Sequence, residues 1–119
     1  MKINILGTAY KILVKKYDEE EAFGRRSIAG FCDGHAKEIV VCDMNTYKGW
    51  EHEEKNTIVA AQKETLRHEI VHAFLNESGL SCSTLANEES GWARNEEMVD
   101  WIAIQGPKLY KAFQDADAL

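Results

Sequence analysis

The chain has 119 residues, of which 45% are hydrophobic, and its 14 basic and 20 acidic residues give a net charge of −6. This length suits one domain, residues 1–119, with a modest core. The acidic balance argues against nucleic acid as the main partner, because phosphate binding needs clustered lysine and arginine.

Membrane and secretory signals are also missing from the sequence. No apolar run approaches the roughly 20 residues that a membrane span requires, so we expect no membrane partner. The first residues, Met-Lys-Ile-Asn-Ile-Leu-Gly, are too polar for a secretory signal. Cys32, Cys42 and Cys82 are an odd number without zinc-knuckle spacing, which fits a reducing compartment. We therefore expect a cytoplasmic protein.

The first half of the chain has the pattern of a sheet. Residues 2–16 alternate apolar and polar positions as strands do, with Gly7 marking a turn or a bulge. Two further strands are expected at residues 26–32 and 37–44. They flank residues 33–36, which begin Asp-Gly, a strong local signal for a hairpin.

The second half has the pattern of helices. Residues 57–79 predict one long helix, because they contain good helix formers, no proline, and apolar residues at three- and four-residue spacing. Residues 81–91 read as a loop, and a second helix is expected from about Trp92. We expect this helix to stop at Gly-Pro, residues 106–107, and a separate short helix to follow around residues 109–113.

The long helix contains an H-E-x-x-H motif at residues 68–72. Residues four apart on a helix lie about 40° apart around the axis and about 6 Å along it. His68 and His72 can therefore reach one metal ion while Glu69 lies beside an open coordination position. The alternative is a pair of idle histidines, but two imidazoles beside apolar residues such as Leu66 would then need other partners. The motif favours a Zn²⁺ site.

A catalytic zinc takes three protein ligands and keeps one open position. We expect His35 and His52 to be exposed loop residues, and a Cys82 thiolate is a less common ligand with this motif. Glu96 and Glu97 on the second helix are better candidates, because a carboxylate completes a His₂Glu set. The alternative is that both acids only favour a helix N-terminus.

The helical repeat separates these two acids. At about 100° per residue, Glu96 shares a face with Val99 and Asp100, whereas Glu97 projects about 100° away. We therefore predict Glu96 as the third ligand. Asp100 lies one turn further on, where it can hydrogen-bond a ligand histidine. Burial of Trp101 would rotate the helix and favour Glu97 instead.

The H-E-x-x-H motif and the acidic residues of the second helix together resemble the gluzincin pattern. In that pattern H-E-x-x-H is completed by a downstream helical Glu, here in Asn95-Glu96-x-x-x-Asp100. Residues 26–105 are similar in motif order to the ImmA/IrrE-like metallopeptidases. The resemblance implies an α+β, zincin-like minimal domain, with a sheet of three to four strands packed on the two helices. It also implies a zinc endopeptidase, often encoded by phage or mobile elements, that cleaves a repressor-type regulator.

The chemistry of such a site follows from charge. Zinc lowers the pKa of bound water to about 7, and Glu69 then takes a proton as the water attacks a peptide carbonyl. We also expect a second group that donates a hydrogen bond to the oxyanion, and Tyr47, His52 and Arg94 are all candidates. Two other functions compete with this one: a metal-stabilised protein-interaction module that cleaves nothing, and a hydrolase of non-peptide amides.

Overall fold

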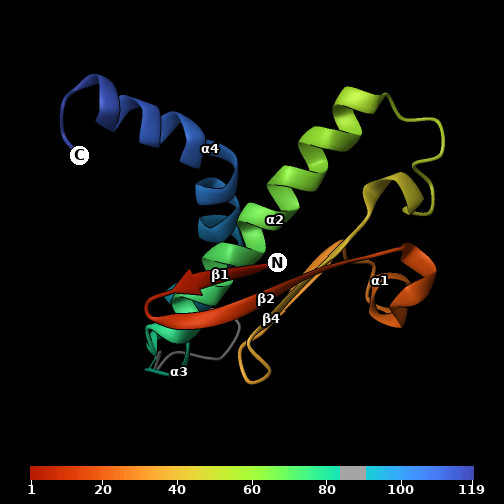
Figure 1. The fold of residues 1–119 in the computed structure, drawn as a ribbon, viewed down its shortest axis with the longest axis horizontal. Coiled ribbons are helices and arrows are strands. Elements are labelled where there is room, and N and C mark those ends of the chain that lie inside the picture. The colour runs from red at the N-terminus through yellow and green to blue at the C-terminus, as the bar shows by residue number, and fades with distance from the viewer. Residues whose placement is uncertain (84–90) are drawn as a thin grey trace.

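The protein has an α+β fold in which a four-stranded mixed sheet packs against a long helix (Figure 1). The strands are β1 (Lys2–Ile5), β2 (Thr8–Lys15), β3 (Gly30–Asp33) and β4 (Glu38–Cys42), and their order in the sheet is β1-β2-β4-β3. β1 pairs with β2 and β3 with β4 in antiparallel fashion, whereas the central pair, β2 and β4, is parallel. The expected small sheet of three to four strands is confirmed.

The computed structural model describes residues 1–83 and 91–119, the side chains of residues 82 and 83 excepted. The helices are α1 (Glu21–Arg25), α2 (Lys55–Glu77), α3 (Leu80–Ser83) and α4 (Glu96–Asp115), with 3₁₀ turns at Tyr17–Glu19, Met44–Thr46 and Trp92–Arg94. The predicted long helix is confirmed as α2, which begins two residues early. The predicted loop at residues 81–91 is wrong at its start, where α3 lies, and its residues 84–90 fall outside the described part. Among the described helices, none is long and apolar enough to cross a membrane.

The predicted hairpin between β3 and β4 forms, but its loop covers residues 34–37, one position later than the predicted 33–36. The left-handed residue of the turn is Lys37, with φ of 59°, rather than a glycine. An Asp33 carboxylate oxygen accepts two backbone N–H bonds of 2.9 Å inside the turn. Gly34 instead allows the hairpin to pack closely on α2, because a Cβ atom there would lie 3.2 Å from Asn76 Nδ2.

The core is built on both faces of the two central strands. Alternation along β4 sends Ile39 and Val41 towards one face, where they pack with Tyr10, Ile12 and Ala73. Val40 and Cys42 point the other way and pack with Phe23 and Met44. Because β4 is buried on both faces, it reads as a continuous apolar run in the sequence.

The predicted stop at Gly106-Pro107 is wrong, because α4 continues through Pro107 to Asp115, and the separate helix at residues 109–113 is its second half. Proline lacks the N–H that would bond the carbonyl four residues earlier, that of Ala103. Arg67 Nε of α2 donates to that carbonyl instead. Figure 1 shows α4 bending away from α2 along its length, as expected for a helix with an internal proline.

A carboxylate fastens the end of α2 to the sheet. The Glu77 side chain, 16% exposed, lies 2.8 Å from Lys37 Nζ and accepts hydrogen bonds from Thr8 Oγ1 at 2.6 Å and Tyr10 Oη at 2.9 Å. These three donors lower the pKa of Glu77 from 4.5 to about 2. The folded state therefore favours the ionised carboxylate, and Glu77 contributes stability above pH 4.5 that is lost as the pH falls towards 2.

We expect Glu77→Gln to lower the melting temperature at pH 7, because it removes the charge that the three donors face. The difference from the unsubstituted protein should shrink as the pH falls from 4.5 to about 2, where the Glu77 carboxylate itself is neutralised. Thermal unfolding followed by circular dichroism at several pH values measures this. Glu53→Gln, at an exposed position, is the matched control. A difference that stays constant with pH would contradict the assignment.

Candidate metal centre

Helix α2 presents both histidines of the motif on one face. His68 and His72 lie one turn apart, each with about a fifth of its side chain exposed, and their Nε2 atoms are 3.1 Å from each other. Their rings meet edge to face with centroids 4.8 Å apart. Two imidazole nitrogens that converge in this way can share one bound cation.

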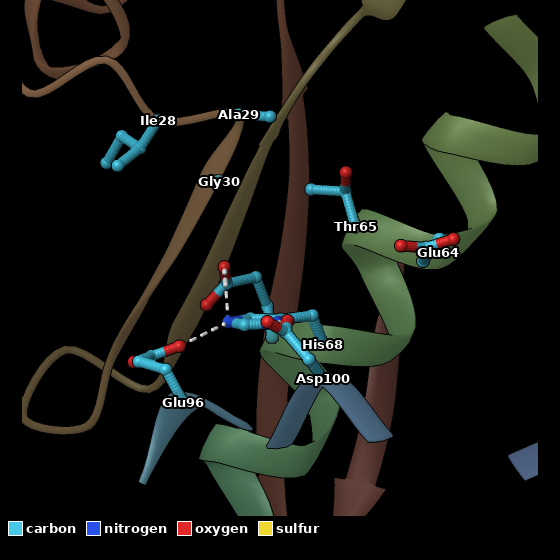
Figure 2. Close-up of a pocket in the computed structure, with 9 residues that line it drawn as sticks. Ile28, Ala29, Gly30, Glu64, Thr65, His68, Glu96 and Asp100 are labelled. Carbon is cyan, nitrogen blue, oxygen red and sulfur yellow. Dashed lines mark hydrogen bonds and ion pairs between the residues drawn. The ribbon is translucent and has the colours of Figure 1, made fainter. Parts of the chain in front are cut away.

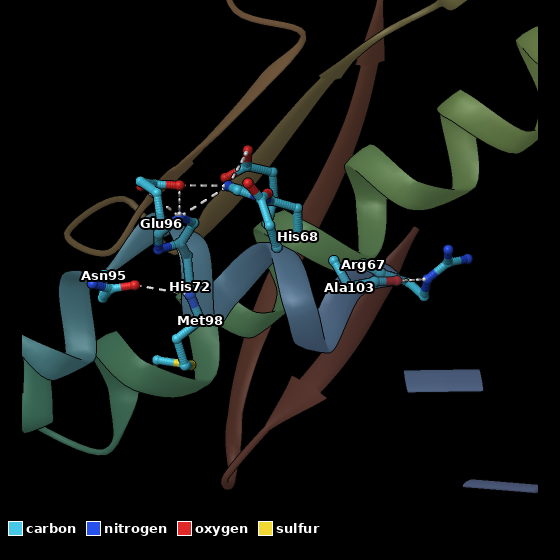
Figure 3. A network of polar contacts seen from close by, with 9 residues as sticks. Arg67, His68, His72, Asn95, Glu96, Met98 and Ala103 are labelled. Carbon is cyan, nitrogen blue, oxygen red and sulfur yellow. Dashed lines mark hydrogen bonds and ion pairs between the residues drawn. The ribbon is translucent and has the colours of Figure 1, made fainter. Parts of the chain in front are cut away.

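Helix α4 brings a carboxylate to the same point. Its first turn is fixed by Asn95, whose Oδ1 atom accepts from the Met98 backbone N–H at 2.9 Å. Glu96 Oε2 then lies 3.0 Å from His68 Nε2, and Glu96 Oε1 lies 3.2 Å from His72 Nε2 (Figure 3). Ligand-type atoms from two helices therefore meet in one small volume.

The spacing of these atoms fits a tetrahedral zinc ion. Ligand atoms bound 2.0–2.1 Å from such an ion lie about 3.3 Å from one another. With Glu96 Oε2 as the ligand atom, its distances to His68 Nε2 and His72 Nε2 are 3.0 and 3.4 Å, and the two Nε2 atoms are 3.1 Å apart. The donor set, two imidazoles and one carboxylate, is also one that zinc accepts with a fourth position open.

Asp100 fixes the tautomer of His68. Its Oδ1 atom lies 2.7 Å from His68 Nδ1, so the Nδ1–H group donates a hydrogen bond to the carboxylate. His68 Nε2 is then left with its lone pair directed towards His72 and Glu96. Burial lowers the pKa of His72, and the nearby Glu96 carboxylate opposes that effect. A lowered pKa favours the neutral imidazole, which is the form that binds metal.

Glu69 lies beside the ligand set and is the most buried carboxylate of the group, 6% exposed. One of its oxygens lies 4.0 Å from His68 Nε2, and the ligand-type atoms of His68, Glu69 and His72 all fall within 4.8 Å of one another. Burial raises the pKa of Glu69 to about 7, with Glu96 adding to the rise and His68 and Arg26 opposing it. A bound cation would lower this pKa again.

Two adjoining cavities open on this group. The first, of about 320 Å³, lies between residues 28–30 and α2 and is lined by Glu69, His68, Glu96 and Asp100 (Figure 2). The second, of about 790 Å³, shares the first three of these side chains and extends along the β3–β4 hairpin. The group is therefore reached from solvent through a groove between the hairpin side of the sheet and the two helices.

The other residues named from the sequence divide into two sets. His35 and Arg94 line the larger cavity, and both are exposed. His52 is exposed in the turn before α2, and Tyr47 packs edge to face on Tyr17, with ring centroids 5.2 Å apart. The Cys82 side chain lies outside the described part of the structure.

The face of α4 that meets α2 carries Val99 and Ala103, both buried. Trp101 is 55% exposed, so the rotation that would turn Glu97 inward does not occur. Glu97 itself is exposed. On this helix, Glu96 and Asp100 are therefore the acidic residues that contact the two imidazoles.

Sequence reasoning missed one residue of the site, Gly30. A Cβ atom at Gly30 would lie 3.0 Å from the Val40 carbonyl oxygen, 3.1 Å from Thr65 Cγ2 and 3.2 Å from Glu69 Cγ. Glycine therefore lets β3 approach α2 closely at Glu69. The local signal is a glycine inside a predicted strand, which indicates a bulge or a close backbone approach.

Searches of protein-family models, curated proteins and solved structures found no match to this chain.

The contacts rank the acidic side chains by their effect on metal affinity. Glu96→Ala should weaken zinc binding most, by more than the roughly 10- to 100-fold that loss of an outer hydrogen-bond partner costs. Asp100→Asn should fall within that range, because it disturbs only the His68 tautomer. Glu97→Ala is the matched control and should bind zinc as the parent protein does. Competition titration with a chromophoric chelator measures the zinc affinity of all three variants. A larger loss of affinity in Glu97→Ala than in Glu96→Ala would contradict the assignment of Glu96 as a ligand.

Proposed function

We propose that this chain is a zinc-dependent endopeptidase, with His68, His72 and Glu96 as metal ligands and Glu69 as the catalytic carboxylate. The observation that carries the proposal is the convergence of two imidazoles and a carboxylate at tetrahedral spacing, beside a buried glutamate and an open groove. The resemblance to gluzincins and to ImmA/IrrE-like metallopeptidases supports the same reaction. A cytoplasmic location fits the free thiols Cys32 and Cys42.

A bound zinc ion supplies an activated water and a Lewis acid for the substrate carbonyl. Glu69 takes a proton at its carboxylate during attack on the peptide carbonyl and returns that proton to the leaving amine. Asp100 holds His68 in the tautomer whose Nε2 faces the ligand set. Among the three oxyanion candidates, Arg94 is the one that lines a described cavity with the ligands, and we assign it that role.

The shape of the groove supports an extended peptide as substrate. A third cavity, of about 500 Å³, shares Ala29, Glu64 and Thr65 with the cavity at the metal ligands. Its remaining lining is largely apolar: Met44, Trp50, Thr57, Ala60 and Ala61. An extended chain advances about 3.3 Å per residue, so neighbouring residues of one peptide can reach both cavities. We therefore expect an apolar side chain next to the cleaved bond.

The central test separates metal binding from catalysis. The parent protein should carry about one zinc per chain, as a three-ligand site requires, and Glu69→Gln should retain it. The glutamine cannot accept the proton, so hydrolysis of a proteome-derived peptide library should fall by about 10²–10⁴-fold. Elemental analysis and mass spectrometry of the products measure the two effects. Zinc binding without cleavage by the parent protein would favour the interaction module, and equal cleavage by both proteins would exclude Glu69 as the base.

The apolar cavity yields a separate prediction about specificity. Ala60→Glu introduces a carboxylate into the lining, so cleavage next to apolar residues should fall while zinc content stays unchanged. Ala112→Glu makes the same change on an exposed turn of α4 and is the matched control. The two cleavage profiles are compared by mass spectrometry on one peptide library. Identical profiles would show that the substrate does not enter this cavity.

A further inference from the structure

Polar contacts at three positions of α4 join this helix to α2 along the seam that contains the ligand set, and Figure 3 shows those at Glu96 and Ala103. They link His72 to Glu96, His68 to Asp100, and Arg67 to Ala103. Positions rise along α4 as they fall along α2, so the two helices run antiparallel here. On α4 the three contacts follow one another at intervals of about one helical turn.

The contact of Arg67 differs from the other two because it reaches the backbone. Its Nε atom donates to the Ala103 carbonyl, the group that the residue at position 107 would satisfy in an uninterrupted helix. That residue is Pro107, which has no N–H to donate. Ala103 is buried, and a buried carbonyl without a partner destabilises the fold. The guanidinium of Arg67 replaces the missing intrahelical donor.

The same contact lies where α4 leaves the body of the protein. Ala103 is the last buried residue of the helix, and every residue from Pro107 to Asp115 is exposed. Asp100 and Glu96 lie three and seven residues before Ala103, on the segment that Arg67 holds against α2. A shift of this segment would move both carboxylates relative to the histidines.

We infer that Arg67 is a positioning residue for the metal centre. By donating to the carbonyl that Pro107 leaves without a partner, it holds α4 in the register that brings Asp100 to His68 and Glu96 to both imidazoles. Arg67 lies next to His68 in sequence, so the side chain that braces α4 and the side chain that binds metal come from the same turn of α2. The inference rests on the proposed function in that it concerns the same ligand set.

A double-mutant cycle tests this pairing. The four proteins are the parent, Arg67→Met, Pro107→Ala and the double variant, with Lys63→Met as a control that removes an exposed cation one turn earlier on α2. Methionine keeps much of the length of arginine but has no donor, and alanine restores the N–H at position 107. Zinc affinity is measured by chelator competition. Thermal unfolding and the ¹⁵N shift of His68 Nδ1 are measured on the metal-free proteins.

We expect Arg67→Met alone to weaken zinc binding by about tenfold, as loss of an outer support does, and to change the His68 Nδ1 shift. In the Pro107→Ala background the same substitution should cost less than about twofold, because the backbone N–H regained at position 107 bonds the Ala103 carbonyl. Lys63→Met should bind zinc as the parent does.

Two results would overturn the inference, and a third would overturn the proposed function. An equal loss of affinity in both backgrounds would show that Arg67 acts by charge or packing. A lower melting temperature of Arg67→Met with unchanged zinc affinity and an unchanged His68 Nδ1 shift would limit the role of Arg67 to structural support. A parent protein that binds no zinc would reject the proposed function itself; an unchanged His68 Nδ1 shift in metal-free Arg67→Met would then also reject the positioning role.

Discussion

The close packing of α4 on α2 is the constraint on which the candidate site depends. The sequence places two histidines on one helix, but the third donor belongs to another helix and must be brought within about 3 Å of both. Small side chains at Val99 and Ala103 allow that approach, and both are buried in the contact. The sheet contributes indirectly: it buries the opposite side of α2 and so turns the histidine face towards α4.

The features of the structure that can be predicted from the sequence are those determined by neighbouring residues. Helix α2 follows from its composition and spacing, and the motif at residues 68–72 follows from the geometry of any helix. The β3–β4 hairpin was found because Asp-Gly favours turns, although Lys37 adopts the left-handed conformation there. The orientation of α4 was also recoverable, because Val99 and Ala103 are small and lie one turn apart.

The parts that sequence reasoning missed depend on contacts between distant residues. Pro107 is a reliable local signal for a helix end, yet α4 continues because Arg67, 40 positions away in the sequence, takes over the free carbonyl. Gly30 is part of the site only because β3 approaches α2 at Glu69. Neither partner can be read from a window of neighbouring residues, so local rules give the wrong end for α4 and do not identify Glu69 as the neighbour of Gly30.

The order of the elements along the chain also sets an order for assembly during synthesis. All four strands lie within residues 2–42, so the complete sheet emerges from the ribosome before α2 does. The apolar face formed by Tyr10, Ile12, Ile39 and Val41 then stays uncovered until residues up to Ala73 have emerged. The two helices that carry the histidines and the carboxylates follow the strands along the chain. The nascent chain therefore completes its scaffold before its ligand set, and the full set of metal ligands is available only once α4 has emerged.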